Sequence, residues 1–391
     1  MKKLIVTAIL GIFTFGIITA QTEEPQEQIF PFHFGIVPRS IDGQFTNKAS
    51  FNLFVGLSKN EKAFTFSSLA SIIRNNASGL QLAGLYNQIG NDANGLQFAG
   101  LLNIIGNNAS GLQLGGLANL TTNDFKGLQF AGLLNKSRTM TGLQLAGISN
   151  YTTGDAKGFQ FGGIVNIASN DFTGLQLAGI ANITTNNVKG MQFAGLINAA
   201  ENVKGLQFAA LVNRAKNVKG VQFAALVNIA EHSDYPIGLI NIIKEGEKSL
   251  GVTYDDTGST ILAFRSGGRI LYGILGTGYN YKAHDEKFVM EGGFGAHIPI
   301  IERFRINLEA KTQHMTSFKS TYVSKNTFSI LPAFKILQNL EIFAGPTLNH
   351  MITDNLENTN LFLSNNLWKS FGDSKLKQLY IGYTAGVQYI F

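Results

Sequence analysis

The chain of 391 residues contains no cysteine, a single tryptophan and few charged side chains. The absence of cysteine excludes disulfide bonds, thiolate zinc sites, iron–sulfur clusters and a cysteine nucleophile. Lys, Arg, Asp and Glu together make up 14% of the residues, whereas an average soluble domain has about 25%. The net charge of +6 is spread along the chain, and no run of Lys or Arg occurs. A nucleic-acid partner is therefore not expected.

Long apolar runs are also missing beyond the N-terminus. No later segment approaches the roughly 18 consecutive apolar residues of a membrane helix. If the mature protein is embedded in a membrane, it must be as a closed β-barrel, because only helices and closed barrels satisfy their backbone polar groups in lipid. The chain is also rich in glycine, with 44 of 391 residues. The composition therefore indicates an all-β protein.

The N-terminus has the layout of a secretory signal peptide. Two lysines precede an uncharged apolar run over residues 4–18, and Ala20 follows. This pattern predicts export, with cleavage near Ala20. We therefore assign residues 1–20 to a signal peptide and residues 21–61 to an N-terminal segment with the first strands.

A tandem repeat fills residues 62–246. Its core reads Gly-Leu-Gln-(Leu/Phe)-(Ala/Gly)-(Gly/Ala)-(Leu/Ile)-x-Asn and recurs ten times at steps of 15 or 16 residues. Apolar residues alternate along it, and Gly and Asn are too frequent for a helix, so each repeat is expected to be a strand and a turn. The recurring amides are Gln81, Asn87, Gln97, Asn103, Gln113, Asn119, Gln129, Asn135, Gln144, Asn150, Gln160, Asn166, Gln176, Asn182, Gln192, Asn198, Gln207, Asn213, Gln222 and Asn228.

Two architectures accommodate this repeat. In an antiparallel outer-membrane β-barrel, each ~16-residue repeat is one strand and one turn, and the amides line the lumen. Successive linkers then lie on opposite rims, which accounts for Thr pairs such as 121–122 and 152–153 after alternate copies. In a parallel β-solenoid, identical residues stack about 4.8 Å apart and the Asn series forms an internal ladder. Invariant Leu and Gly on the two faces suit the solenoid better.

The C-terminal third, residues 247–391, reads as barrel strands without a repeat. Along residues 304–313, apolar and polar residues alternate, and Arg305, Glu309 and Lys311 fall on the polar face. Such a run suits a hydrated lumen, and its mixed charges predict no strong ion selectivity. The chain ends on a further alternating strand that resembles the terminal signal of bacterial outer-membrane barrels. One face of that strand carries Tyr383, Val387, Tyr389 and Phe391.

These features favour one large antiparallel barrel of about 20–22 strands, built mostly from the repeats. The alternative is a parallel solenoid joined to a small C-terminal barrel of about eight strands. The repeats also resemble those of a bacterial surface-repeat family, which carries the same unit in tandem behind a signal peptide. That resemblance covers roughly residues 64–241. It implies an envelope or surface location and brings no catalytic residues with it.

No pattern in the chain points to catalysis, a metal or a cofactor. The six histidines show no HExxH-type spacing, and no Gly-x-Ser-x-Gly motif occurs. We therefore expect a non-enzymatic outer-membrane barrel that acts as a passive channel for small solutes. Its partners would be outer-membrane lipid and the barrel-assembly machinery. The alternative is a structural or adhesive cell-surface repeat protein, whose solenoid is anchored by its C-terminal strands.

Overall fold

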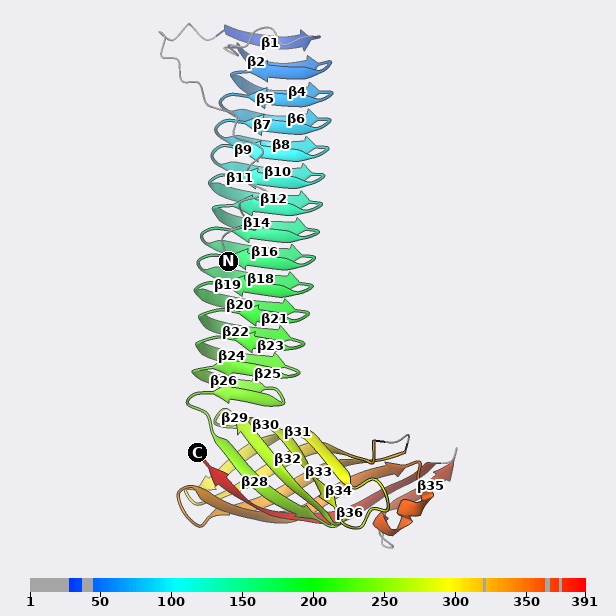
Figure 1. Ribbon diagram of the computed structural model, residues 1–391. Coiled ribbons are helices and arrows are strands. Elements are labelled where there is room, and N and C mark those ends of the chain that lie inside the picture. The colour runs from blue at the N-terminus through cyan, green and yellow to red at the C-terminus, as the bar shows by residue number, and fades with distance from the viewer. Residues whose placement is uncertain (1–27, 37–44, 319–320, 363–365, 373–374) are drawn as a thin grey trace, which may run out of the picture.

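The computed structural model describes residues 28–36, 45–318, 321–362, 366–372 and 375–391. The predicted signal peptide lies outside these described residues. They form a parallel β-solenoid followed by an antiparallel β-barrel (Figure 1). None of the described helices is long and apolar enough to cross a membrane.

The solenoid has thirteen coils with two strands each, and every coil contributes one strand to each of two parallel sheets. Sheet one begins with an additional strand and contains β1 (Gln28–Gly35), β2 (Phe45–Asn52), β4 (Asn60–Ser67), β6 (Ala77–Ala83), β8 (Ala93–Ala99), β10 (Ala109–Gly115), β12 (Asp124–Ala131), β14 (Thr139–Ala146), β16 (Ala156–Gly162), β18 (Phe172–Ala178), β20 (Asn187–Ala194), β22 (Asn202–Ala209), β24 (Asn217–Ala224) and β26 (His232–Ile237). Sheet two contains β3 (Val55–Ser58), β5 (Ala70–Ile73), β7 (Tyr86–Ile89), β9 (Leu102–Ile105), β11 (Ala118–Thr121), β13 (Leu134–Ser137), β15 (Ser149–Thr152), β17 (Val165–Ala168), β19 (Ala181–Thr184), β21 (Ile197–Ala199), β23 (Val212–Arg214), β25 (Val227–Ala230) and β27 (Ile240–Ile243).

Equivalent residues of successive repeats stand in register. Gln97 pairs with Gln113, and Gln113 pairs with Gln129, each one coil further on. The glycine before each Leu-Gln makes this stacking possible. Gly158, for example, has φ +123°, and a Cβ there would lie 2.0 Å from the carbonyl oxygen of Gly142 in the preceding coil. A side chain at this position would therefore be strained and would also push the coils apart.

The prediction of one large barrel built from the repeats is wrong, and the alternative, a solenoid with a small C-terminal barrel, is confirmed. The repeat does not supply one long strand that pairs antiparallel with the next. It bends at the Ala-Gly-Leu turn into two short strands, such as β8 and β9, and each pairs in parallel with its copy one coil away. The Gln and Asn face is thereby enclosed between two sheets.

All the linkers lie on one edge of the solenoid, so their alternation along the repeat does not come from opposite rims. The buried residues that flank a linker differ in volume from coil to coil. Ile89 precedes one linker and Ala93 follows it, whereas two coils later Thr121 precedes a linker and Phe125 follows it. Because interiors are close-packed, the large residue at each of these linkers is matched by a small one on the other side.

The barrel is an antiparallel meander of eight strands that closes by pairing β28 with β36. Val252 lies opposite Val387 across this seam. One further strand, β35, pairs only with the start of β36 and extends the wall beyond the ring. The elements are β28 (Lys248–Asp255), β29 (Ser259–Gly267), β30 (Leu271–Asn280), β31 (Phe288–Ile301), β32 (Phe304–Thr316), β33 (Tyr322–Lys335), β34 (Leu340–Thr353), the 3₁₀ helix η1 (Leu356–Leu361), β35 (Trp368–Gly372) and β36 (Lys375–Ile390).

The two ends of the barrel differ. At one end, which we call the short-turn end, three turns join neighbouring strands at residues 268–270, 302–303 and 336–339. Both the entry at Lys248 and the C-terminus also lie there, since an even number of strands returns the chain to its starting end. The opposite end, called the long-loop end, holds the connection over residues 281–287 and the longer one that contains η1 and β35.

The solenoid joins the barrel at its outer wall. The Asn241 backbone nitrogen donates to Ser266 Oγ at 2.9 Å, and the Asn241 amide donates to the Ser266 carbonyl oxygen at 3.0 Å. Gly273 on β30 leaves room for this contact, because a Cβ there would lie 2.0 Å from the carbonyl oxygen of Gly238. In Figure 1 the solenoid stands across the barrel: its coils stack away from the barrel wall, while the barrel extends sideways from the C-terminus toward β35.

Candidate functional site

Two amide ladders run through the solenoid interior. Most Gln side chains donate toward the N-terminal coil, as from Gln97 Nε2 to Gln81 Oε1 at 3.0 Å, and this ladder is interrupted between Gln97 and Gln113. Asn side chains donate toward the C-terminal coil, as from Asn103 Nδ2 to Asn119 Oδ1 at 2.8 Å. The same Asn103 Nδ2 lies 2.9 Å from the carbonyl oxygen of Leu114, so the Asn ladder ties sheet two to sheet one of the next coil. The two ladders therefore run in opposite directions along the stack.

All twenty amides predicted from the repeat lie in these ladders and are fully buried. They line no lumen and are not open to a solute. The Asn ladder is continuous from Asn87 to Asn241, with bonds of 2.8–3.1 Å. Each buried amide that loses its partner would keep the full cost of desolvation. The ladders therefore specify the stacking register and resist separation of the coils.

The two edges of the solenoid differ in chemistry. One edge holds the linkers, with Asn, Asp and Thr side chains bonded from coil to coil. Asn107 Nδ2, for example, donates to Asn91 Oδ1 at 3.0 Å. The other edge holds the turn after sheet one, where each coil exposes a Leu or Ile. We call this row the apolar ridge: Leu69, Leu85, Leu101, Leu117, Leu133, Ile148, Ile164, Ile180, Leu196, Leu211 and Leu226.

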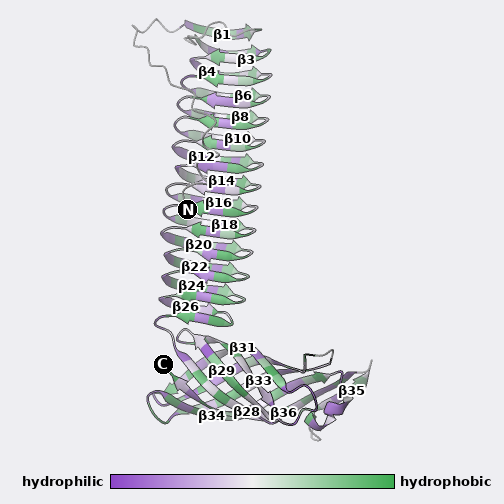
Figure 2. Cartoon of the chain, viewed as in Figure 1, coloured by the Kyte–Doolittle hydropathy of each residue, from purple (hydrophilic) through white to green (hydrophobic). Residues whose placement is uncertain are grey.

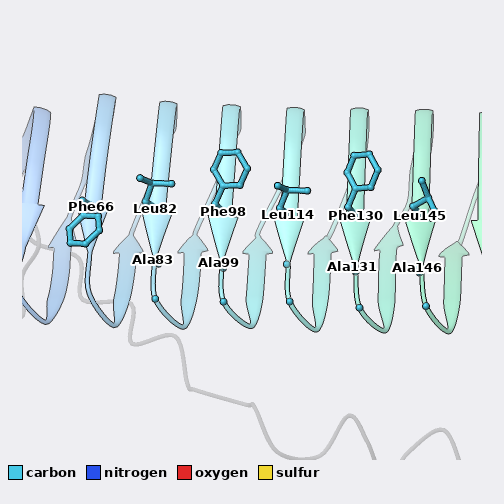
Figure 3. A pocket seen from close by; sticks show the side chains of 16 residues that line it. Phe66, Leu82, Ala83, Phe98, Ala99, Leu114, Phe130, Ala131, Leu145 and Ala146 are labelled. Carbon is cyan, nitrogen blue, oxygen red and sulfur yellow. The ribbon is translucent and has the colours of Figure 1, made fainter.

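A second apolar row lies beside the ridge on the outer face of sheet one. Figure 3 shows Phe66, Leu82, Phe98, Leu114, Phe130 and Leu145, one on each successive coil, above a floor of Ala and Gly. The open groove they form has a volume of about 810 Å³. The ridge and this groove make one side of the solenoid apolar over its whole length.

The interior of the barrel is filled by paired charges. The three charges predicted from the alternation all point inward. Arg305 bonds Glu247 at 2.6 Å and Glu341 at 2.8 Å, and Lys311 lies 3.3 Å from Glu291. These side chains meet counter-charges instead of a water-filled lumen.

A second group of inward charges continues this network across the barrel. Glu309 accepts from Arg265 at 2.8 Å and from Tyr272 at 3.1 Å. Lys325 lies 2.6 Å from Asp255. Arg265, Glu309 and Lys325 are at most 2% exposed. An eight-stranded ring is just wide enough for its own side chains, so this interior is closed to solutes.

Sequence reasoning missed the partners of these charges. Arg265, Glu291, Lys325 and Glu341 all fall on the inward side of alternating strands, by the same parity that identified Arg305. The alternation of inward and outward positions could therefore have identified these residues. Their pairings, however, depend on which strands are neighbours in the closed barrel and on their register. Glu247 precedes β28; although burial acts to raise its pKa, hydrogen bonds from Arg305 hold that pKa below its usual range.

The outer wall of the barrel is an uncharged belt. Apart from Lys248, Lys375 and Lys377 at strand starts, no outward position on the eight strands carries Asp, Glu, Lys or Arg. Figure 2 shows the resulting alternation of hydrophobic and hydrophilic residues along these strands. The four residues of the predicted C-terminal signal lie on this wall and are exposed: Tyr383, Val387, Tyr389 and Phe391.

Aromatic side chains mark both borders of the belt. The short-turn end carries Phe304, Phe334, Tyr389 and Phe391 on outward positions. The long-loop end carries Tyr254, Tyr279, Phe288 and Tyr322, and the rings of Tyr279 and Phe288 meet edge to face at 6.2 Å. An apolar band between two aromatic girdles is the pattern of transmembrane β-barrels.

Comparisons with known proteins add little to this geometry. No family model matches the chain, and no curated protein matches it. Among solved structures, one titled "De novo design of transmembrane beta-barrels" is similar, with 13% identity, covering 37% of this chain and 93% of that one, at a TM-score of 0.22. A likeness of this size carries no argument. Among the described residues, no three His, Asp or Glu side chains gather as metal ligands would.

Proposed function

We propose that this protein is a non-enzymatic structural protein of the bacterial outer membrane, in which the barrel is a membrane anchor and the solenoid is a rigid spacer. The observation that carries the proposal is the barrel's outer wall. It is mostly apolar, with polar exceptions such as Thr312, Asn326 and His350, and it is bordered by aromatic rings, whereas nearly all charges of the same strands point inward. In water this arrangement would expose a large apolar surface to solvent. In a bilayer the outer wall contacts lipid, and the inward charges pair with one another.

A channel is the weaker proposal. The barrel interior is filled by ion pairs whose side chains are buried from water, so no continuous path for a solute exists between them. The solenoid is equally closed, because its two amide ladders occupy the space between the sheets. The function is therefore to hold a surface at a defined place and not to conduct.

The orientation follows from the ends of the barrel. Bacterial barrels place short turns in the periplasm and long loops outside the cell. The solenoid enters the barrel at the short-turn end, so it would lie on the periplasmic side and not on the cell surface. With thirteen coils at about 4.8 Å each, it would extend for roughly 60 Å.

Single-cysteine labelling tests this arrangement. Because the chain contains no cysteine, an introduced cysteine is the only thiol that can be labelled. A membrane-impermeant maleimide should label Lys369→Cys, at the long-loop end, on intact cells. It should label Thr153→Cys, on the polar edge of the solenoid, only after the outer membrane is permeabilised. Labelling of Thr153→Cys on intact cells would instead place the solenoid at the cell surface.

The anchor itself is tested by charge substitution in the belt. Phe328 lies near the middle of β33 and is 47% exposed on the outer wall. Phe328→Arg should lower stability in bilayers by about 2–4 kcal/mol, the cost of an arginine at the bilayer midplane. Thr153→Arg is the matched control and should have no such effect. Equal stability of Phe328→Arg and the parent in lipid vesicles would show that the belt does not contact lipid.

A further inference from the structure

The apolar ridge of the solenoid continues onto the outer wall of the barrel. In the last coil the ridge position is occupied by Leu239, in the turn between β26 and β27. Its Cδ2 lies 3.5 Å from where a Cβ on Gly292 of β31 would be. Leu239 also lines a hollow of about 470 Å³ with the belt residues Phe294, Phe328 and Leu348, and the hollow includes the polar Thr312, Asn326 and His350. The ridge therefore meets the belt at Leu239.

The ridge also faces the direction in which the barrel crosses its membrane. Sheet-one strands are parallel to β1, which points in Figure 1 toward the side where β35 and the long-loop end lie. The turns that carry the ridge follow the ends of these strands, so the ridge lies on that side. The polar linkers lie on the opposite edge, facing away from the membrane.

The apolar area of the ridge is larger than expected for a surface that faces only water. Its eleven side chains are each 38–46% exposed. Together they present on the order of 700 Å² of apolar surface, which exceeds the roughly 300–600 Å² of the largest patch on a typical monomer. The neighbouring groove on sheet one adds further apolar area. An uncharged row of this kind that meets the barrel belt fits contact with lipid acyl chains.

We infer that the solenoid lies along the membrane that holds the barrel, with its apolar ridge among the acyl chains of that membrane. The inference rests on the proposed function, because the barrel sets the direction of the membrane. Three observations carry it: the contact of the ridge with the belt through Leu239, the placement of the solenoid across the barrel, and the apolar and polar edges on opposite sides of the solenoid. The long axis of the solenoid then runs along the membrane, and the solenoid does not project away from the membrane.

Quenching of tryptophan by brominated lipid tests this contact. The only tryptophan is Trp368, so Trp368→Phe gives a silent background for the full mature chain in phosphatidylcholine vesicles with brominated acyl chains. Three single reporters are compared in that background. Leu262→Trp reports on the barrel belt, Leu133→Trp on the ridge, and Thr153→Trp on the polar edge.

Both Leu262→Trp and Leu133→Trp should lose at least half of their emission in brominated vesicles, and Thr153→Trp should lose none. Quenching of Leu262→Trp together with an unquenched Leu133→Trp would overturn the ridge inference and leave the anchor intact. Absence of quenching at Leu262→Trp would overturn the anchor and the inference with it. An emission of Leu133→Trp that is blue-shifted but unquenched would assign the ridge to a second copy of the chain and refute lipid contact.

A second variant guards against lipid affinity introduced by the reporter itself. With the tryptophan placed at Ile164, the flanking ridge residues Leu133, Ile148, Ile180 and Leu196 are replaced by Gln. These side chains are exposed, so the fold should be kept, as far-UV circular dichroism would verify. Quenching at position 164 should fall to the level of the polar-edge reporter. Unchanged quenching would show that the ridge does not hold the solenoid on the membrane.

Discussion

Replacing one amide of the Asn ladder by its isosteric acid tests whether the ladder stabilises the solenoid. Asn150 is fully buried. Its Nδ2 donates to the Phe161 carbonyl oxygen at 2.8 Å and to Asn166 Oδ1 at 2.8 Å, and its Oδ1 accepts from Asn135 Nδ2 at 3.0 Å. Asn150→Asp keeps the shape and the acceptor but removes both donors. Two buried acceptors would then face a carboxylate oxygen.

The magnitude follows from these contacts. A buried polar group that loses its partner costs about 1–3 kcal/mol, so two such groups would cost about 2–6 kcal/mol. The buried carboxylate adds to this cost, because burial disfavours its charged form and raises its pKa. A raised pKa means that the folded state holds the proton more tightly than the unfolded state. The stability of the variant should therefore fall as pH rises above about 4, the ordinary pKa of Asp.

Hydrogen exchange read by mass spectrometry localises the effect. Because each coil contacts only its neighbours, protection should drop in the coils around Asn150 and stay unchanged in the barrel. Asn94→Asp is the matched control. Asn94 is exposed, and its Oδ1 accepts from Ser110 Oγ at 2.9 Å, a bond that an aspartate retains. Unchanged protection in Asn150→Asp, or an equal loss in Asn94→Asp, would refute the stabilising role of the ladder.

Three further predictions follow from the solenoid. Gly158→Ala should lower the melting temperature of the solenoid, because the new Cβ would lie 2.0 Å from a backbone oxygen, whereas Gly372→Ala should be neutral, since a Cβ there meets nothing within 4 Å. Phe172→Ala should cost about 3–5 kcal/mol in denaturant unfolding, and partial recovery by Ala168→Phe would support the volume rule across the linker. Burial raises the pKa of Glu61 above its ordinary 4.5; the folded state then holds the proton more tightly, so stability falls as pH rises above 4.5. Glu61→Gln should therefore stabilise the N-terminal coils against thermal unfolding at pH 7 and have little effect at pH 4, and equal effects at both pH values would contradict this assignment.

Much of the architecture could be read from local patterns. The recurrence of Gly-Leu-Gln predicted strands and turns, because alternation and glycine content are properties of a short window. The last strand, ending at Phe391, and the parity of Arg305, Glu309 and Lys311 predicted a C-terminal barrel with charges inside. In each case the signal lies within a dozen neighbouring residues, and the structure places these residues as their parity requires.

The pairing of the repeats could not be read in this way. Parallel coils and antiparallel barrel strands share the same alternation, so both place Gln97 and Asn103 on one face and Leu96 and Phe98 on the other. What separates them is whether the chain bends at Gly100, and a bend of this kind is also compatible with a turn between long strands. The two architectures differ in the contacts between repeats, where Gly158 meets the carbonyl of Gly142 and leaves no space for a side chain.

The sequence by itself therefore determined the strands, their faces and the inward charges, since these depend on residues close together in the chain. Only the tertiary structure decided that the amides bond to one another instead of lining a lumen. It likewise decided that Arg265 pairs with Glu309, 44 positions away, because the closure of the ring sets which strands meet. The continuity of the ridge with the belt depends on the contact between Leu239 and the barrel wall, which no local pattern encodes.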